Sequence, residues 1–301
     1  MEYTLLHTNI DGTPCPECKA VSFEINLSNL LNYFSEVEMK CSKCDAKLDW
    51  WALLLRHFEW GFPSYLYAIV GGLQTSLMIH MKPNESYELD LLKIGIPKES
   101  KILQVSYTPN GNGLFPIEVH GNTPYRHFIP HKIILFGRPF GEPSEKTPVA
   151  VSINWVLQTE NNELWDNLVE SVEAFSINKF QASIIPANVA VEAKLNEMMD
   201  AYLSKYASSK RVSDFLVSGA TYSHQLNILL PLISNIEKFP NLPDHIRGGL
   251  NELRDYRNKI AHKGTTVKPL DKKTTGRLLC SASFALGYLT LLENKIGKSH
   301  T

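Results

Sequence analysis

Two pairs of cysteines, each with the spacing C-x2-C, constrain the fold of this chain more than any other feature. Cys15 and Cys18 form the first pair, Cys41 and Cys44 form the second, and 22 residues separate the two pairs. Each pair can present two thiolates from a tight turn, and two facing turns complete a tetrahedral metal site. Four thiolates leave no open position and suit structural Zn²⁺. We expect a zinc ribbon here; an iron site and two chance pairs of free thiols are the alternatives.

The rest of the composition is that of an ordinary folded protein. Of the 301 residues, 44% are hydrophobic, 10% aromatic and 20% charged, which excludes a disordered chain, a collagen-like repeat and a free-standing coiled coil. The longest apolar runs, around residues 51–55 and 228–236, fall short of the roughly 18 to 20 residues that a membrane span needs. The first residues, MEYTLLHTNIDGT, lack the basic and apolar regions of a secretory signal. We therefore expect a cytoplasmic protein with no membrane partner.

The sequence pattern changes near residue 160. Before this point, between residues 75 and 157, apolar stretches alternate with turn signals rich in Gly, Pro and Asn, which predicts strands; these stretches are YELDLLKIGI, KILQVSY, FPIEVH, HKIILFG and VAVSINWVL. After it, apolar residues recur at helical spacing in five segments, at residues 163–180, 188–207, 223–239, 244–262 and 274–296. The expected fold is α+β, with a zinc-ribbon module at residues 1–70, a β-rich domain at 71–160 and an all-α domain at 161–301.

Three other groups of residues have an expected structural role. Cys280 lies in an apolar helical segment and is expected to be a buried small hydrophobe. An aromatic stretch follows the ribbon and is expected to pack between the ribbon and the β-rich domain, with base stacking or partner binding as the alternative; it comprises Trp50, Trp51, Phe58, Trp60, Phe62, Tyr65 and Tyr67. A histidine cluster near turns is expected to be structural, with a second metal site or a ligand pocket as the alternative; it comprises His120, His127 and His131.

A short motif ends one of the predicted helices. In LNELRDYRNKIAHKG, Arg257 precedes Asn258 and stands five residues before His262. The string R-x4-H is common by chance, and residues 126–131 match it too, but there two flanking prolines oppose a regular helix. On an ideal helix Arg257 is rotated by about 140° from His262. The two side chains can converge only if the last turn loosens, as Lys263-Gly264 would allow, or across a dimer.

The string RNKIAH at the end of a helix resembles the R-[NHD]-x3-H form of the R-x4-6-H motif of HEPN domains. The segment NVAVEAKLNEMMDAYL also resembles the second helix of HEPN domains from prokaryotic defence and toxin proteins. The resemblance covers residues 161–297 and leaves out the ribbon and the β-rich segment. It implies a metal-independent endoribonuclease, acting as a toxin or antiviral defence effector, in which two HEPN domains form a homodimer and contribute Arg257 and His262 to a shared cleft. Family members with degraded motifs only bind.

The chemistry of these side chains agrees with that implication. RNA carries its own nucleophile, the 2′-hydroxyl, so the protein has to move protons and stabilise charge on the phosphorus centre. Imidazole can act as acid or base near neutral pH, which suits His262. The guanidinium of Arg257 offers a planar fork of donors for phosphate oxygens. Asn258 could orient the imidazole or the phosphate. The expected products are a 2′,3′-cyclic phosphate and a 5′-hydroxyl, and no catalytic metal is expected.

Local charge favours a polyanionic partner although the net charge of the chain is -1. Residues 1–160 carry 13 basic and 17 acidic side chains, whereas residues 161–301 carry 17 and 14. Between residues 247 and 277 there are nine basic and three acidic residues, a net charge of +6. Such a patch attracts a phosphate backbone. The alternative is a solvated basic surface with a histidine that caps the helix.

Two hypotheses follow. In the first, an N-terminal module recognises a protein or phage-derived trigger and the helical domain cuts RNA as a homodimer. In the second, the protein is a non-catalytic zinc-ribbon adaptor whose helical domain binds RNA or nucleotide without cutting it. Glu192, Arg254 and Asp255 are possible further contacts of the cleft in either case.

Overall fold

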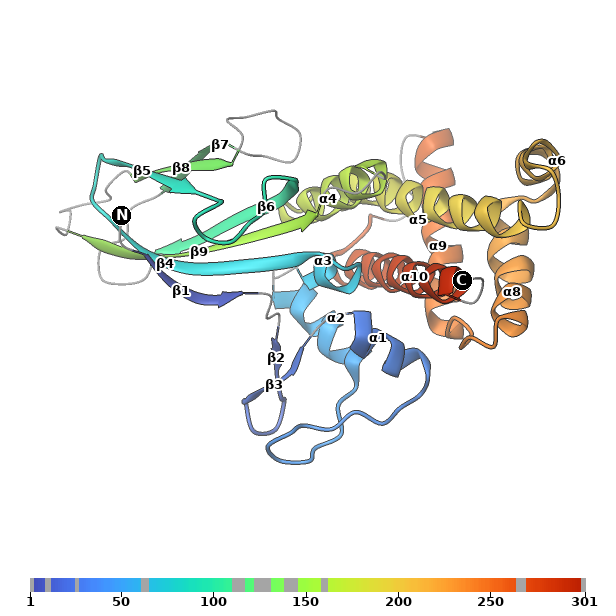
Figure 1. Cartoon of the computed structure of the whole chain (residues 1–301), viewed down its shortest axis with the longest axis horizontal. Helices are drawn as coiled ribbons and strands as arrows, with labels where there is room; N and C mark the ends of the chain where they lie inside the picture. The colour runs from blue at the N-terminus through green and yellow to red at the C-terminus, as the bar shows by residue number, and fades with distance from the viewer. Residues whose placement is uncertain are drawn as a thin grey trace. The chain divides into compact units, whose positions relative to one another are not determined.

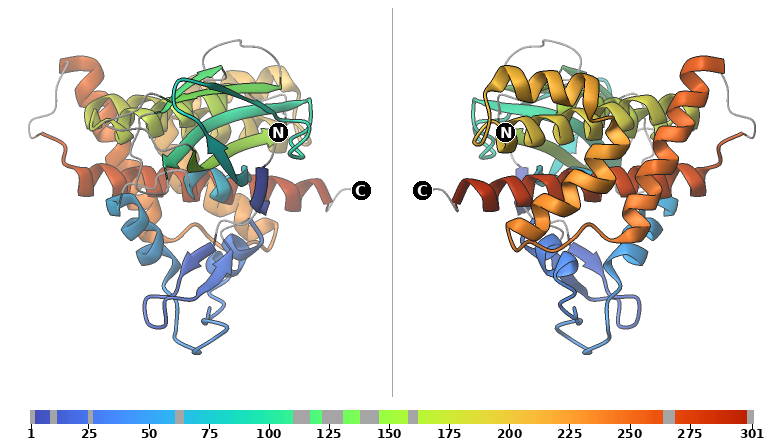
Figure 2. Two further views of the ribbon diagram at one scale, coloured as in Figure 1. Left: turned by 90° about the vertical axis from the view of Figure 1, so that its left-hand side faces the viewer. Right: turned by 90° about the vertical axis from the view of Figure 1, so that its right-hand side faces the viewer.

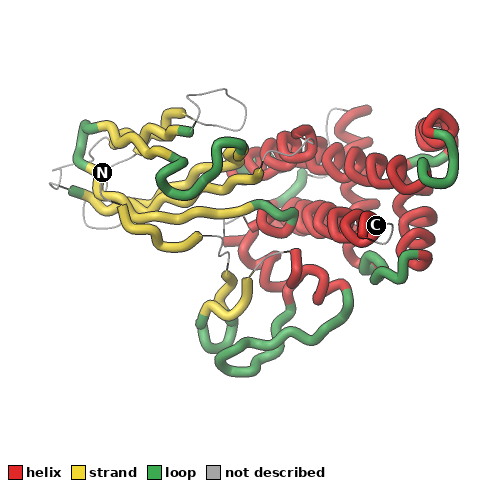
Figure 3. Tube along the Cα trace, viewed as in Figure 1, coloured by secondary structure: helices red, strands yellow, loops and turns green. Residues whose placement is uncertain are grey.

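The computed structural model describes residues 3–8, 12–24, 27–60, 65–109, 117–121, 131–137, 146–157, 162–263 and 269–298. In these segments the fold is α+β, with antiparallel sheets and a C-terminal region of several helices (Figure 3). The chain forms two compact units. The β unit comprises residues 1–11 and 72–162, and the helical unit comprises residues 12–71 and 163–301. Neither unit is one continuous stretch, in contrast to the three consecutive modules that the sequence pattern suggests.

The β unit contains two antiparallel sheets. In the larger sheet the strands lie in the order β1 (Tyr3–Thr8), β4 (Leu73–Met81), β9 (Thr147–Leu157) and β6 (Ser100–Pro109), as Figure 1 shows. In the smaller sheet the order is β5 (Ser86–Asp90), β8 (Lys132–Gly137) and β7 (Ile117–Gly121). The five strand-like stretches of the sequence all contain strands. Residues 3–8 were expected in the ribbon module, but they pair with β4 instead.

The two sheets share one apolar core, and in β8 and β9 alternate side chains face it. In β9, for example, Val149, Val151 and Ile153 are fully buried while the residues between them are partly exposed. Leu77 of β4 and Leu135 of β8 belong to the same buried cluster. This alternation is the period of two that an antiparallel sheet with one buried face requires.

The helical unit begins with the short hairpin β2 (Gly12–Pro14) and β3 (Val21–Glu24) and with α1 (Leu27–Phe34), α2 (Trp50–Trp60) and α3 (Tyr65–Ile69). It continues with α4 (Asn162–Ser176), α5 (Phe180–Leu203), α6 (Ser209–Asp214), the π-helix η1 (Phe215–Gly219), α7 (Tyr222–His224), the π-helix η2 (Gln225–Leu229), α8 (Leu230–Ile236), α9 (Asp244–Lys263) and α10 (Lys272–Lys298). The long helices α9 and α10 cross each other in both views of Figure 2.

Two helix boundaries differ from the sequence prediction for reasons that involve proline. Helix α5 starts at Phe180 and not near residue 188, and it contains Pro186 in its interior. The segment at residues 223–239 is not one helix, because it passes from α7 through η2 into α8, which has Pro231 in its first turn. Pro231 lacks the amide hydrogen that a continuous α-helix would use, and the wider π turn precedes it.

Helix α10 is the core of the helical unit. It packs against α5 and α9 and also against α1, α2 and α3. Among the described helices it is the one long and apolar enough in composition to cross a membrane, over residues 272–297, but 83% of its apolar window is buried inside the protein. Such burial is that of a central bundle helix. Cys280 is fully buried in this helix, as predicted, and burial raises the pKa of its thiol.

Aromatic residues of α1 and α2 pack against α10. The rings of Trp50 and Trp51 meet Phe284 edge to face, with centroids 6.0 and 5.1 Å apart. Phe34 of α1 meets Tyr288 in the same way at 5.1 Å. These contacts bury large apolar surfaces, which explains why residues 12–71 belong to the helical unit. The expected core role is confirmed for Trp50 and Tyr67, which are 0% and 1% exposed. The side chains of Phe58, Trp60, Phe62 and Tyr65 lie outside the described residues.

Candidate functional site

The four cysteines of the two C-x2-C pairs form one cluster. Their sulfur atoms all lie within 4.8 Å of one another, with 3.7 Å between Cys15 Sγ and Cys44 Sγ and 3.6 Å between Cys18 Sγ and Cys41 Sγ. Four sulfurs that bind one tetrahedral metal at about 2.3 Å would be about 3.8 Å apart. The cluster therefore has the dimensions of a structural four-thiolate metal site.

The two cysteine turns have the same backbone geometry. In the first, the amide of Cys15 donates to the carbonyl of Ala20, and Lys19 adopts a positive φ of 62°. In the second, the amide of Cys41 donates to the carbonyl of Ala46, and the residue after Cys44 again adopts a positive φ, of 56°. The amide of Lys43 also donates to Cys41 Sγ at 3.4 Å. Such matched turns aim two sulfurs each at a common point, and hydrogen bonds to sulfur stabilise thiolates.

The predicted motif lies at the C-terminal end of α9, which remains helical to Lys263. Arg257 and Asn258 are half-buried, and Arg257 Nη1 donates a hydrogen bond to Asn258 Oδ1 at 3.0 Å. His262 is exposed. Because the helix is regular through His262, the last turn does not bring Arg257 and His262 to one side within a chain. Of the two routes to convergence, the loosened turn does not occur here.

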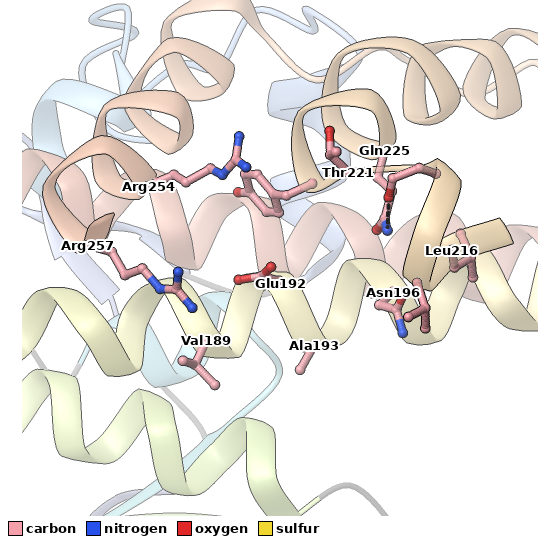
Figure 4. Close-up of a pocket in the computed structure, with 12 residues that line it drawn as sticks. Val189, Glu192, Ala193, Asn196, Leu216, Thr221, Gln225, Arg254 and Arg257 are labelled. Carbon is pink, nitrogen blue, oxygen red and sulfur yellow. Dashed lines mark hydrogen bonds between the residues drawn. The ribbon is translucent and has the colours of Figure 1, made fainter. Parts of the chain in front are cut away.

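Arg257 lines a pocket of about 620 Å³ that His262 does not line. The pocket lies between α5, α9 and the segment from η1 to η2, and Figure 4 shows the side chains of Arg254 and Arg257 reaching from α9 into the pocket, which Glu192 of α5 also lines. Its walls combine charged, polar and apolar side chains: Val189, Glu192, Ala193, Asn196, Leu216, Val217, Ala220, Thr221, Tyr222, Gln225, Arg254 and Arg257.

Arg254 and Tyr222 interact electrostatically within the pocket. The guanidinium of Arg254 lies over the ring of Tyr222, 5.4 Å from its centroid, a distance at which the ring face attracts the cation. The pKa of Tyr222 is raised, first by burial and then by the negative charge of Glu192, while Arg254 acts in the opposite direction. The Glu192 carboxylate is itself held by Asn188, whose Nδ2 donates to Glu192 Oε2 at 3.1 Å.

In the structure, Arg257 therefore shares a pocket with residues that the sequence analysis named only as possible contacts or did not name. Glu192 and Arg254 were possible contacts, and both line the pocket with Arg257. Asp255 does not line it. Tyr222 was not expected at all. A glutamate within the apolar pattern of α5 could have indicated Glu192 as a pocket residue. Tyr222 is next to no motif, so nothing in the sequence indicated it.

The basic character of residues 247–277 is partly neutralised. Arg277 Nη2 forms an ion pair with Glu252 Oε2 at 2.6 Å, and Arg247 pairs with Asp244. Lys259 lies over the ring of Tyr256, on its own turn of α9. Among the described residues of this segment, Arg254 and Arg257 line the pocket without forming an ion pair.

The competing Arg–His match and most of the histidine cluster lie outside the described residues. This holds for residues 122–130 and for the side chain of His120. His131 is described; its carbonyl accepts a hydrogen bond from the amide of Leu91 at 2.8 Å, and its φ is 68°. It therefore has a backbone role at the start of β8.

Comparison with known proteins adds no family to this geometry: no protein-family model matches the chain, and neither the curated proteins nor the solved structures contain a significant match. The function of the site therefore has to be inferred from its own residues.

Proposed function

We propose that the helical unit is a metal-independent endoribonuclease of the HEPN type, in which Arg257 and His262 act in a cleft formed by two copies of the chain. The observation that carries this proposal is the placement of Arg257 and His262 near the end of α9. One helix presents the Arg257 guanidinium to an open pocket beside a second arginine, and five residues later it presents His262 to solvent. A nuclease that needs no metal requires these two kinds of group, a fixed cation for the phosphate and an imidazole for proton transfer.

The reaction can be written with these groups alone. The 2′-oxygen of the RNA attacks the adjacent phosphorus atom as an imidazole accepts the 2′-hydroxyl proton. The bond from phosphorus to the 5′-oxygen breaks, and that oxygen takes up the proton from the imidazolium so formed. In a dimer, the imidazole is His262 of one chain and the guanidinium beside it is Arg257 of the other. Arg257 stabilises the charge that develops on the non-bridging oxygens, and Asn258 holds its guanidinium in place.

The cysteine cluster has a separate role in this proposal. Zinc is the metal that best suits four thiolates at these distances, and it would cross-link the two turns on either side of α1. Helices α1 and α2 pack on α10. Zinc would thus stabilise the support of the catalytic unit and take no part in the reaction.

The test is cleavage of a 5′-labelled single-stranded RNA by the purified full-length protein in buffer freed of divalent ions. Wild-type protein should cut, with 2′,3′-cyclic phosphate ends, and RNA with 2′-deoxy residues should remain intact. Arg257→Ala and His262→Ala should each abolish cleavage. Arg211→Ala on the exposed face of α6 and His80→Ala in the β unit serve as matched controls and should cut normally. Cleavage that survives both site substitutions would contradict the proposed chemistry.

Zinc retention has to be measured in the same samples, because a chelator can remove a structural ion as well as a contaminating one. Metal analysis after chelator treatment separates these effects. If cleavage is lost only when zinc is also lost, the cause is unfolding of the zinc-stabilised segment that supports the catalytic unit. Cleavage lost while zinc is retained shows a need for another metal and refutes metal independence.

A further inference from the structure

The pocket beside Arg257 contains a carboxylate that is positioned but not neutralised. Asn188, which is 0% exposed, donates one hydrogen bond to Glu192 Oε2 and so fixes the orientation of the carboxylate. Within the described residues, no ion pair joins Glu192 to Arg254 or to Arg257, although both arginines line the same pocket (Figure 4). Glu192 therefore retains acceptor capacity, and the two guanidinium groups retain donors, for a molecule inside the pocket.

A buried hydroxyl points to the same conclusion. Tyr222 is 5% exposed and lines the pocket, and its Oη has no hydrogen-bond partner among the described residues. A buried hydroxyl without a partner costs free energy, so its presence in a pocket indicates a partner supplied by a ligand. The ring of Tyr222 also holds the Arg254 guanidinium in place from one side, at 5.4 Å from the centroid.

The remaining walls and the size suit a nucleotide. Val189 and Leu216 supply apolar surface on which the faces of a planar base can pack. The volume of about 620 Å³ lies in the range of pockets that bind small organic ligands, about 300 to 1,000 Å³. A phosphate would take the arginine end of the pocket, next to the proposed cleavage site, and the base would extend toward Glu192.

We propose that this pocket binds a guanine nucleotide, with the Glu192 carboxylate accepting hydrogen bonds from the N1–H and N2–H groups of the base. Arg257 holds the adjoining phosphate, while Arg254 and the Tyr222 hydroxyl contact the nucleotide between them. This inference rests on the proposed function insofar as the nucleotide is part of the RNA that is cut. It names the base next to the cleaved phosphate.

The choice of guanine follows from hydrogen-bond polarity. A carboxylate is an acceptor only, so it matches a base edge that presents adjacent donors. Guanine has two adjacent donors on its Watson–Crick edge. Adenine and cytosine present one amino group beside a ring nitrogen with a lone pair, which a carboxylate repels, and uracil presents one N–H between two carbonyl oxygens. A two-point contact of this kind discriminates by about 1–3 kcal/mol between bases in nucleic-acid recognition, which corresponds to about 5- to 150-fold in affinity.

The experiment measures binding and not cleavage, so that it can fail independently of the nuclease proposal. Full-length His262→Ala protein is titrated with fluorescent hexanucleotides of 2′-deoxyuridine that carry one central guanosine, adenosine, cytidine or uridine. Guanosine should bind about 5- to 150-fold more tightly than the other three. Free 3′-GMP and 3′-AMP form a second arm. Preference for guanine in both arms assigns the pocket to a nucleotide as such, and preference only in the oligonucleotides assigns it to a residue of an RNA strand.

Three variants then locate the preference. Glu192→Gln replaces one acceptor by a donor, so it should remove the preference for guanine and shift it toward adenine, which presents a matching donor and acceptor. Glu170→Gln, on the exposed face of α4, is the matched control and should bind as the parent does. Tyr222→Phe keeps the ring under Arg254 but removes the hydroxyl, so it should weaken binding severalfold without lowering Tm. A purely structural hydroxyl would instead lower Tm and leave affinity unchanged.

The possible failures are distinguishable. If the wild-type protein cuts RNA but binds all four bases equally, or if Glu192→Gln leaves the preference unchanged, the guanine inference is wrong and the nuclease proposal stands. If guanine is preferred and no RNA is cut, the pocket assignment stands and the nuclease proposal falls.

Discussion

Mixing two inactive variants should restore activity if the site is shared between two chains. The reason is the geometry of α9. Arg257 and His262 lie five residues apart on a regular helix, which separates them by about 140° around the axis and about 7.5 Å along it. Arg257 lines the pocket and His262 does not. A complete site therefore needs Arg257 from one chain and His262 from the other, and Arg257→Ala and His262→Ala should complement each other.

The size of the effect follows from counting pairs. A wild-type dimer has two Arg–His pairs formed across the two chains. Random exchange between equal amounts of the two variants yields about one half mixed dimers, and each mixed dimer retains one intact pair. The mixture should therefore recover about a quarter of the wild-type rate, and mixed dimers purified through two different tags should recover about a half. Sites formed within single chains would recover nothing.

The assay is the rate of cleavage of labelled RNA after co-expression of differently tagged chains. A chain that carries both substitutions provides the reciprocal test, because its excess should suppress wild-type activity by forming dimers without an intact pair. Sedimentation analysis checks that dimers exist at the assay concentration. No recovery in purified mixed dimers, or a wild-type rate unaffected by excess of the double variant, would refute the shared site.

Three further predictions concern the support of the site. Cys41→Ser should reduce bound zinc from one ion per chain to none in metal analysis. It should also lower Tm by about 5 °C or more in calorimetry, which corresponds to a loss of roughly 2 kcal/mol in a unit of this size. Gly287→Ala in α10 should lower the free energy of unfolding in urea by about 1–3 kcal/mol, because the new Cβ would lie 2.6 Å from the carbonyl oxygen of Ile69. Gly297→Ala has open space around it and should be neutral or stabilising. Equal effects of the two substitutions would contradict the packing of residues 12–71 on α10. Burial lowers the pKa of His245 below its ordinary value of 6.5, so the folded state binds this proton less readily than the unfolded state. The free energy of unfolding should therefore be fully retained above about pH 7 and fall as pH drops below about 6.5 toward the lowered pKa. This fall should be smaller in His245→Gln when unfolding is compared at about pH 5 and about pH 8.

The local features of the fold were predictable because they depend on short stretches of sequence. The spacing of Cys15, Cys18, Cys41 and Cys44 predicts a cluster, since two tight turns suffice to present four sulfurs, and the structure brings the sulfurs together. The change of apolar period near residue 160 predicts strands before it and helices after it, and β9 ends at Leu157 while α4 begins at Asn162. The R-N-x3-H string was recognisable as a motif, but its activity and its RNA substrate remain proposals.

Only the tertiary structure decided which surfaces meet. Trp50 and Trp51 could have packed on any apolar face, and α10 was selected because it is apolar around most of its circumference. Glu192 and Tyr222 join Arg257 in one pocket because α5, α7 and α9 pack together, which no spacing along the chain encodes. Short-range pattern determines the type of each element, since hydrogen bonding and side-chain period act over a few residues. The pocket comes from long-range packing of elements that are far apart in the sequence, whereas the separation of Arg257 from His262 follows from their spacing on one regular helix.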